Sequence, residues 1–238
     1  MINQVIDISI WGMILTYVLL IPPVLFTLFY KIEIKKQILI STLRMTVQLL
    51  LIGIFLEYIF ELDNPWLNSG WVILMVLNAA WTVVRRTNMA YKHMYFPVFL
   101  SILIMTVMIV FYFIGGIIQG NTSLFTAQYF IVLSGMLMGN SLKSNILGIE
   151  TFYTNLKNDE ARYKYFLACG ATKTEALYPY FQKAIEHAVN PTLASMATMG
   201  IITLPGMMTG QILGGASPFT AVKYQIAIMV AIFISIIG

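Results

Sequence analysis

Long stretches without a charged residue are the feature that most constrains this chain. An α-helix needs about 20 residues to cross the hydrocarbon layer of a membrane, and five uncharged stretches approach or exceed that length: Ile10–Phe29, Pro65–Val84, Tyr95–Ile118, Ser123–Leu142 and Ala188–Leu213. Only 10% of the residues are charged, whereas soluble domains are about one quarter charged. A membrane β-barrel would alternate apolar and polar residues in short segments. We therefore expect an all-α membrane protein.

The expected architecture is a polytopic bundle of about seven transmembrane helices. The first apolar stretch is kept as a span, because the N-terminus lacks the basic residues that begin a removable signal peptide. The predicted spans are Ile10–Phe29, Ile38–Phe60, Pro65–Val84, Tyr95–Ile118, Ser123–Leu142, Ala188–Leu213 and Pro218–Gly238.

The basic residues predict the orientation of this bundle. All of the 14 Lys and Arg residues except Arg44 and Lys223 fall in connections on one side of the predicted membrane. The acidic residues Asp7, Glu61 and Asp63 fall at the other side. Because basic residues accumulate on the cytoplasmic face, we expect the N-terminus outside, a cytoplasmic C-terminus, and a multi-pass protein of the cell (plasma or inner) membrane.

One connection, Lys143–His187, carries nearly half of the charged residues. Within it, Asn158–Gly170 begins with capping and acidic residues and ends at a glycine, which predicts a short helix. Thr172 and Glu175 have the spacing of a capping box, which predicts a second helix after a turn at Gly170. A proline inside that second helix, Pro179, predicts a bend. The segment is therefore expected to form a helical hairpin.

Three roles for this hairpin were compared. It could rest on the inner leaflet, read DNA as a helix-turn-helix, or dock a cytoplasmic partner. Between Lys157 and His187 five basic residues stand against four acidic ones, and binding phosphates requires an excess of Lys and Arg on one face. We therefore expect no nucleic-acid partner, and the other two roles stay open on the residues alone.

The stretch EARYKYFLACGATKTEAL (Glu160–Leu177) resembles the cytoplasmic coupling segment of ABC-transporter permeases, in which small residues precede a glycine turn between two helices. The rest of the chain is similar to the FetB family of iron-export permeases, which is related to plant aluminium-tolerance transporter subunits. The matching stretches are RMTVQLLLIG (Arg44–Gly53), NAAW (Asn78–Trp81), GMLMGNS (Gly135–Ser141), FLACGATKTEA (Phe166–Ala176), NPTLASMATMGIITLPGMMTGQILGG (Asn190–Gly215) and AVKYQI (Ala221–Ile226).

This resemblance implies a single ABC-transporter permease domain over residues 1–238, with the coupling segment at residues 143–187 inside it. It implies a homodimer in the lipid bilayer that pairs with a separate cytoplasmic ABC ATPase and exports iron or a related metal ion. The residues that it places at the ATPase contact are Glu160, Ala168, Gly170, Ala171 and Thr172.

The sequence also predicts that this chain is not itself an enzyme. An ATP-binding loop of the P-loop type requires the pattern GxxxxGK[ST], and its nearest imitation, Gly170–Thr174, has no glycine beside the lysine. We therefore expect no cofactor on this chain, with ATP and Mg used by the partner subunit. No HExxH or GxSxG motif is present either, which disfavours a membrane protease or hydrolase.

The uncharged run Thr203–Gly215 is built from helix breakers. Gly206, Gly210 and Gly214 recur every four residues, so on a continuous helix they form a smooth stripe that lets helices pack closely. Pro205 would leave the Ile201 carbonyl without its helical partner. Such breakers are tolerated where helices touch or line a path. The predicted packing glycines are Gly135, Gly139, Gly206, Gly210 and Gly214.

Polar and flexible side chains within the predicted spans are the candidates for a translocation path. They are Arg44, Gln48, Asn140, Pro205, Met207, Met208 and Gln211. An ionisable residue inside a span is a functional candidate, although Arg44 is close enough to the cytoplasmic end to anchor the helix there instead. For Asn78 and Asn140 we expect hydrogen bonds between helices. The methionines could alternatively be ordinary core.

The metal ligands stay unknown from the sequence. His93 and His187 are far apart in sequence, and Cys169 is the only cysteine, so no metal-binding spacing is seen. Thioether sulfur suits softer ions than iron, so iron rests on the resemblance alone. The alternatives left open are an ABC exporter of a sugar nucleotide or other small solute, and a passive channel or membrane scaffold without an ATPase.

Overall fold

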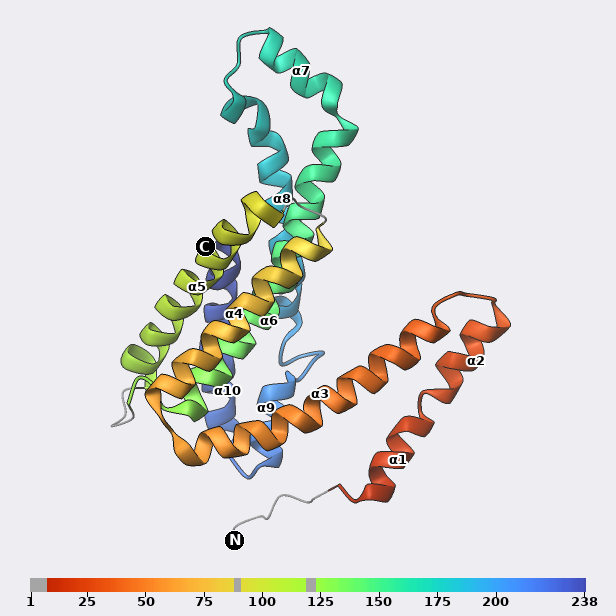
Figure 1. The fold of residues 1–238 in the computed structure, drawn as a ribbon, viewed down its shortest axis with the longest axis vertical. Helices are drawn as coiled ribbons and strands as arrows, with labels where there is room; N and C mark the ends of the chain where they lie inside the picture. The colour runs from red at the N-terminus through yellow and green to blue at the C-terminus, as the bar shows by residue number, and fades with distance from the viewer. Residues whose placement is uncertain (1–7, 88–90, 119–122) are drawn as a thin grey trace. The chain divides into compact units, whose positions relative to one another are not determined.

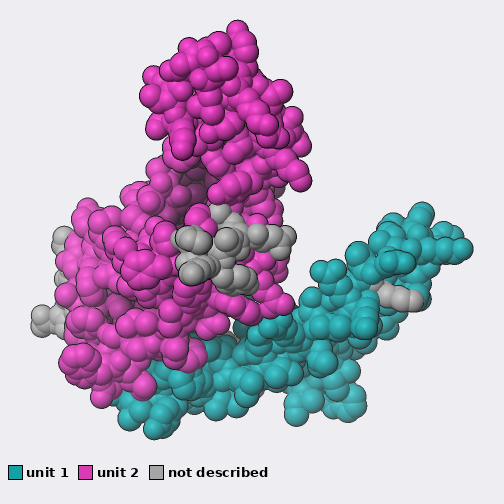
Figure 2. All heavy atoms as spheres, turned by 45° about the horizontal axis from the view of Figure 1, so that its top comes forward, with its two compact units in different colours: residues 1–62, 213–215 teal, residues 63–212, 216–238 magenta. Residues whose placement is uncertain are grey.

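The computed structural model describes residues 8–87, 91–118 and 123–238, without the side chains of Lys35 and residues 91–93. In those residues the chain is helical, and the only β-type pairing is one isolated bridge between Met199 and Thr203. The chain forms two compact units, shown in Figure 2: unit 1 holds residues 1–62 and 213–215, and unit 2 holds residues 63–212 and 216–238. The expectations for Asp7 and for the His93 side chain lie outside the described part.

Unit 1 consists mainly of two arms. The first arm is α1 (Ile10–Val18) followed by α2 (Ile21–Phe29), and the second is the 28-residue α3 (Lys35–Leu62). The first predicted span is therefore two short helices in series rather than one. Prolines at the start of α2 explain the break, because proline fits the first turn of a helix but not its interior.

Unit 2 is a helical bundle with α6 at its centre (Figure 1). Its elements are α4 (Pro65–Arg86), α5 (Tyr91–Tyr112), the π-helix η1 (Phe113–Ile118), α6 (Ala127–Asn158), α7 (Glu160–Ala168), α8 (Lys173–Thr198), α9 (Gly206–Leu213) and α10 (Pro218–Ile237). The bounds of α9 include Leu213, which falls in unit 1. Helix α6 packs against α4, α5, α8 and α10, and this arrangement buries small and β-branched side chains such as Ala80, Val83 and Ala221.

An acidic residue joins α4 and α6 at one end of this bundle. The Asp63 carboxylate accepts hydrogen bonds from the Ala127 backbone N–H at 2.7 Å and from the Asn68 amide at 3.2 Å. The Asn68 amide also donates to the Phe125 carbonyl at 2.8 Å. Asp63 therefore satisfies an unpaired N–H at the start of α6, where the helix dipole also favours a negative charge.

Five segments of the described chain are long and apolar enough to cross a membrane, where the sequence predicted seven spans. They are Ile10–Phe29, Lys36–Leu62, Pro65–Arg86, Met94–Ile118 and Pro218–Ile237. The predicted spans Ser123–Leu142 and Ala188–Leu213 are not among them. Helix α6 carries more polar residues than these five segments, and it continues past Leu142 as a single helix of 32 residues.

The predicted span Ala188–Leu213 is interrupted in the structure. Helix α8 ends at Thr198, Gly200 adopts a φ of 83°, and α9 begins only at Gly206. The sequence placed Pro205 inside a helical span. In the structure it lies in this break instead. Gly214 lies beyond the end of α9, so the predicted three-glycine stripe does not continue along one helix.

Candidate coupling hairpin and intramembrane polar sites

The predicted hairpin is present, and it is longer than expected. Helices α6 and α8 pack side by side, with α7 between them at the end of the hairpin (Figure 1). Gly148 makes the close approach possible, because a Cβ at this position would lie 3.2 Å from the Ala188 Cβ. The predicted polar connection from Lys143 therefore consists largely of the ends of two bundle helices. A displacement of α7 thus has a continuous helical route into the bundle.

The turn between α7 and α8 has the predicted local structure. Gly170 has a φ of 90°, the left-handed region in which glycine alone is free of steric strain. The Thr172 hydroxyl accepts a hydrogen bond from the Glu175 backbone N–H at 3.3 Å, and the Glu175 carboxylate accepts one from the Thr172 N–H at 2.8 Å. This capping box fixes the start of α8. The hydrogen bonds from Thr172 lower the pKa of the Glu175 carboxyl below its usual range.

A buried tyrosine fixes the other side of the hairpin. Tyr180 is 4% exposed, and its hydroxyl donates to the Asp159 backbone carbonyl at 3.3 Å and lies 3.2 Å from the Asp159 carboxylate. Burial, with the negative charge of Asp159 second, raises the pKa of Tyr180. The junction between α6 and α7 is thereby tied to α8, which makes the hairpin a defined structural unit.

The residues predicted to contact an ATPase are grouped at the end of this hairpin. Glu160 begins α7, Ala168 ends it, and Gly170, Ala171 and Thr172 form the turn. All of them are exposed except Ala171, which is half-buried. Glu160 pairs with Lys164 at 2.7 Å, and the hydrogen bond and charge of that lysine lower the pKa of Glu160. The site is thus an exposed, mixed-charge surface with fixed backbone geometry, and its coupling role stays a prediction.

Two of the path candidates, Arg44 and Gln48, lie in unit 1 on a polar stripe of α3. Gln37, Ser41, Arg44 and Gln48 are spaced by four, three and four residues, so they share one helix face. All four are exposed. At 1.5 Å per residue the stripe runs from the first turn of α3 to about 20 Å from the start of the helix, which lies well inside a membrane about 30 Å thick. The sequence analysis did not name Gln37 and Ser41 as candidates, although their spacing from Arg44 and Gln48 predicts that all four share one helix face.

Arg44 differs from the other basic residue of the predicted spans. Lys223, near the start of α10, lies over the Phe219 ring at 4.6 Å. For Arg44 the structure shows no ion pair within the described residues. A charged group at this depth requires a polar partner or water, and the stripe supplies only neutral neighbours on its own helix.

The other path candidates lie in unit 2, and the break before α9 collects several of them. Pro205 is in the break, and Met207, Met208 and Gln211 are half-buried on α9. A buried side chain that the sequence did not single out joins this region. The Gln225 amide, on α10, lies 3.7 Å from the Met199 sulfur at the end of α8.

Two side chains of this region are incompletely hydrogen-bonded. The amide oxygens of Gln211 and Gln225 are buried and have no hydrogen-bond partner among the described atoms. A buried amide oxygen without a partner is costly unless water or a ligand binds it. Gln225 could have been found from its sequence, because it is the polar residue of an otherwise apolar part of α10.

A groove between α4 and α6 brings two further stretches together. It has a volume of about 410 Å³ and is lined by Asn78 on α4 and by Gly135 and Gly139 on α6, among others. A Cβ at Gly135 would lie 3.1 Å from the Met75 methyl group, so α6 approaches α4 closely there. A Cβ at Gly139 would meet no described atom within 4 Å, so that glycine lines open space.

Asn78 and Asn140 do not form the expected hydrogen bonds between helices. The Asn78 amide donates to the Leu74 carbonyl at 3.1 Å, and the Asn140 amide donates to the Met136 carbonyl at 2.9 Å. Both acceptors lie four residues earlier on the same helix. The two side chains are exposed.

Taken together, the apolar helices and the hairpin define a multi-pass helical membrane protein. The sequence comparisons place it further: the profile of the uncharacterised protein family UPF0014 matches residues 10–237, and the chain belongs to that family.

Three relatives illustrate the family. The UPF0014 membrane protein YjkA of Bacillus subtilis is 32% identical over 84% of this chain and 78% of the relative. Protein ALUMINUM SENSITIVE 3 of Arabidopsis thaliana is 33% identical over 83% of this chain and 71% of the relative. The probable iron export permease protein FetB of Escherichia coli is 30% identical over 83% of this chain and 74% of the relative. No solved structure matches the chain.

Proposed function

We propose that the chain is the transmembrane permease subunit of an ABC transporter that exports iron or a related metal ion from the cell. It works in the plasma or inner membrane as a homodimer with two copies of a separate ATPase, which binds ATP and Mg. The single observation that carries this proposal is the α6–α7–α8 hairpin, whose glycine turn and capping box are joined directly to the bundle. The relative named as an iron export permease supports the direction and the cargo.

The hairpin suggests how force from the ATPase reaches the membrane. Closure of the ATPase dimer on ATP pushes the exposed turn around Gly170. Since Tyr180 ties the junction of α6 and α7 to α8, and the capping box fixes the start of α8, the push moves the end of the hairpin as a unit. Helix α8 ends at the break before α9, where an irregular backbone can change conformation more easily than a continuous helix. Opening there is the proposed gate, with Pro205, Met207, Met208 and Gln211 along it.

The polar groups at the gate suit a metal cargo in chemical type. Hard cations bind oxygen ligands, including amide and backbone carbonyl oxygens. The oxygens of Gln211 and Gln225 are buried without a described partner, and those groups would replace part of the hydration shell of an ion.

One observation favours a second cargo class, a sugar nucleotide or another small anionic solute. Arg44 presents a guanidinium group on the polar stripe of α3, and guanidinium pairs with phosphate through two parallel hydrogen bonds. Transport assays in sealed vesicles that contain the ATPase, comparing metal ions with sugar nucleotides, distinguish the two cargoes.

Co-purification with the ATPase tests the proposal itself. Gly170→Trp should abolish co-purification, because tryptophan strains the left-handed turn and covers the contact surface. Gln211→Ala, on α9, should retain the complex while reducing transport. If Gly170→Trp leaves the complex intact, or if no ATPase binds the wild-type protein, the coupling role is wrong and a passive channel or scaffold takes its place.

A further inference from the structure

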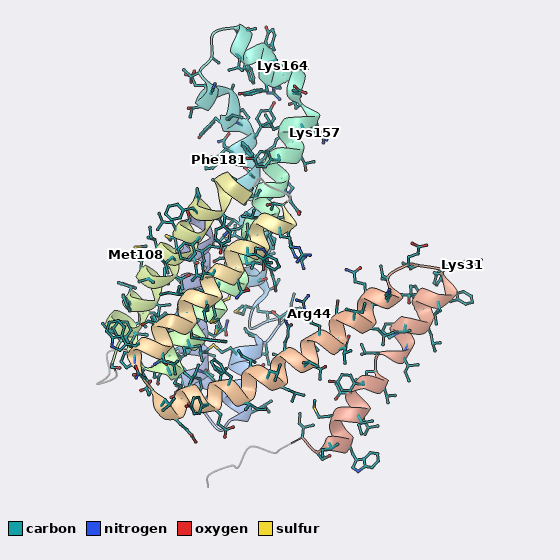
Figure 3. All side chains as sticks on the ribbon, viewed as in Figure 1. Lys31, Arg44, Met108, Lys157, Lys164 and Phe181 are labelled. Atoms are coloured by element: carbon teal, nitrogen blue, oxygen red, sulfur yellow. The ribbon has the colours of Figure 1, made fainter. Side chains whose placement is uncertain are left out.

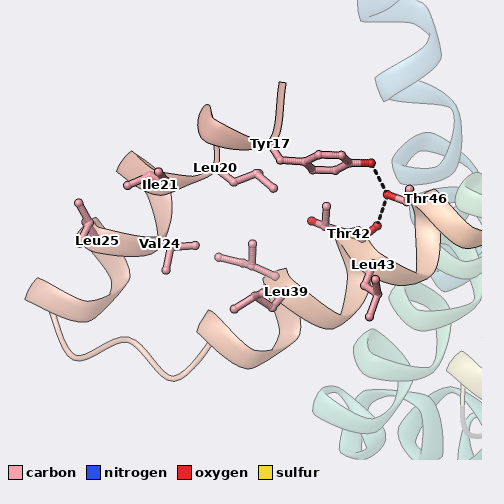
Figure 4. Close-up of a pocket in the computed structure, with 10 residues that line it drawn as sticks. Tyr17, Leu20, Ile21, Val24, Leu25, Leu39, Thr42, Leu43 and Thr46 are labelled. Atoms are coloured by element: carbon pink, nitrogen blue, oxygen red, sulfur yellow. Dashed lines mark hydrogen bonds between the residues drawn. The ribbon is translucent and has the colours of Figure 1, made fainter. Parts of the chain in front are cut away.

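Unit 1 contains an open apolar gap between its two arms. The gap has a volume of about 540 Å³, which falls in the range of roughly 300–1,000 Å³ for small-molecule sites. Val24 and Leu25 line it from α2, and Leu39 and Leu43 line it from α3 (Figure 4). Leu25, Leu39 and Leu43 are each more than half exposed, so the gap is open to its surroundings.

One hydrogen bond joins the two arms on one side of this gap. Thr46 donates its hydroxyl hydrogen to the Thr42 carbonyl at 2.9 Å, so the Tyr17 hydroxyl, 2.7 Å from the Thr46 oxygen, acts as the donor to Thr46. Figure 4 shows this contact at the edge of the gap. It links α1 to α3 across a distance of 29 residues in the sequence.

The connection between α2 and α3 closes the other side. The Ile32 N–H donates to the Thr27 carbonyl at 2.9 Å, and the Thr27 hydroxyl donates to the Val24 carbonyl at 2.8 Å. Thr27 is only 5% exposed. Since the arms are joined at both sides and separated between them, the opening is a built feature of the unit.

The connection between α2 and α3 also carries a net positive charge. Residues 30–36 contain Lys31, Lys35 and Lys36 against one acidic residue, Glu33. Lys31 is exposed at the turn, as Figure 3 shows, and Lys36 is exposed at the start of α3. Tyr30 stands at the same level, where aromatic residues meet the membrane interface. An apolar gap that ends at a cluster of lysines matches the two parts of an anionic lipid.

We propose that this gap binds one acyl chain of an anionic phospholipid, with the lipid phosphate at Lys31 and Lys36. The gap lies between two segments of membrane-spanning length, so lipid chains are its immediate surroundings. Each lysine near an anionic headgroup contributes to the attraction. The bound chain would separate the two arms as a fixed spacer.

The volume of the gap favours a lipid chain over a helix from another protein. A helix about 10 Å wide occupies roughly 420 Å³ in each 5.4 Å turn. The gap of about 540 Å³ would therefore admit little more than one turn, whereas a narrow acyl chain can follow its full length.

Lipid retention measured by native mass spectrometry tests the proposal. The full chain is reconstituted in vesicles of equal phosphatidylcholine and phosphatidylglycerol and then released into mild detergent. We expect one phosphatidylglycerol to stay bound to the wild-type protein. Val24→Trp fills the gap, and because each displaced methylene changes binding by about fourfold, the loss of a few lowers retention by at least about tenfold. Val18→Trp, at an exposed residue outside the gap, is the matched control and should retain the lipid.

The headgroup is tested with the double variant Lys31→Gln and Lys36→Gln, which should bind phosphatidylcholine and phosphatidylglycerol equally. Thermal melting checks folding: Val24→Trp and Val18→Trp should melt alike in lipid-free detergent, and added phosphatidylglycerol should stabilise only Val18→Trp. Equal lipid retention by the two tryptophan variants overturns the proposal. So does a disulfide-linked dimer of Val24→Cys in a Cys169→Ser background, since it would place a second copy in the gap.

Discussion

The membrane-length segments of the two units are similarly apolar in sequence but differ in how their apolar side chains are covered. In α4 and in α10, 39% of the most apolar part of each helix is buried within the chain. In α3 none of the most apolar part is buried. In water this difference would make α3 unstable. In a membrane, lipid chains are as apolar as leucine, so helices associate through close packing and polar contacts instead.

The residues in contact show why the two units differ. Helix α4 presents a face of small and β-branched residues, with Val76, Ala80 and Val83 fully buried. Helix α3 presents leucines on most of its surface, including Leu43, Leu50 and Leu51, each more than 60% exposed. Small side chains allow two backbones to approach, and large flexible ones suit contact with lipid. The comparison therefore predicts that substitutions in unit 2 have large effects and that those on α3 have small ones.

The largest effect is expected for a bulky residue in the core of unit 2. Ala80→Phe forces an aromatic ring into a fully buried position of α4, and such overpacking costs about 1–3 kcal/mol or more. The matched change on α3, Leu50→Phe, adds a ring to a side chain that is 61% exposed. Yield of monodisperse protein and thermal melting in detergent compare the two variants. Equal losses in both would show that α3 is packed as tightly as α4.

The second largest effect on stability is expected for a substitution of Asp63. Asp63→Ala removes the acceptor for the Ala127 N–H and the Asn68 amide. Asn68 and Ala127 are buried, and a buried donor left without its partner costs about 1–3 kcal/mol, so the free energy of unfolding of unit 2 should fall by up to that order. Glu61→Ala, at an exposed residue of α3, is the control and should change little. Hydrogen exchange at the N-termini of α4 and α6 measures the local effect, and unchanged protection in Asp63→Ala would contradict this role.

The sequence predicted local structure well where short-range chemistry determines it. The Thr172–Glu175 capping box and the Gly170 turn were both predicted and both are present, because they depend on hydrogen bonds within a few residues. The all-helical class followed from the length of the apolar runs.

Features that depend on contacts between distant helices were not predicted. The sequence treated Lys143 as the start of a connection, yet α6 continues to Asn158 because α8 packs beside it. It also treated residues 188–213 as one helix, although Gly200 and Pro205 together favour a break. The sequence marks Gln225 as a polar residue inside a predicted span, but its contact with Met199 exists only where α8 and α10 meet. The glycine and path roles stay predictions.

A smaller effect is expected at the hairpin cap. Thr172→Ala removes the N-cap hydroxyl of α8, which costs about 1 kcal/mol at a typical helix start. The effect should be local, appearing as faster hydrogen exchange in the first turn of α8 without a change in overall melting. Thr174→Ala, two residues on and outside the cap, is the control. Slower exchange or no change in Thr172→Ala would show that the turn is held by other contacts.

The stability of the hairpin cap should also depend on pH, in a direction that the pKa of Glu175 determines. The pKa of Glu175 is lowered in the folded hairpin, so its charged form stabilises the fold above the pKa of the unfolded chain. That contribution is lost as the pH falls through the folded pKa. The protection of the first turn of α8, after correction for the intrinsic exchange rate at each pH, should therefore decrease on acidification in the wild type. Glu175→Gln should remove this dependence.

The smallest effect on stability is expected for the ion pair at the start of α7. Glu160 and Lys164 are 2.7 Å apart, but their side chains are 60% and 69% exposed, and exposed pairs contribute little because water and salt screen them. Lys164→Gln should therefore leave melting unchanged. If the hairpin is an ATPase contact, Glu160→Gln should weaken co-purification with the ATPase while leaving melting unchanged too. Destabilisation by either variant would mean that the pair holds the hairpin together, and the exposed end of unit 2 would then be stabilised more like its core than like α3.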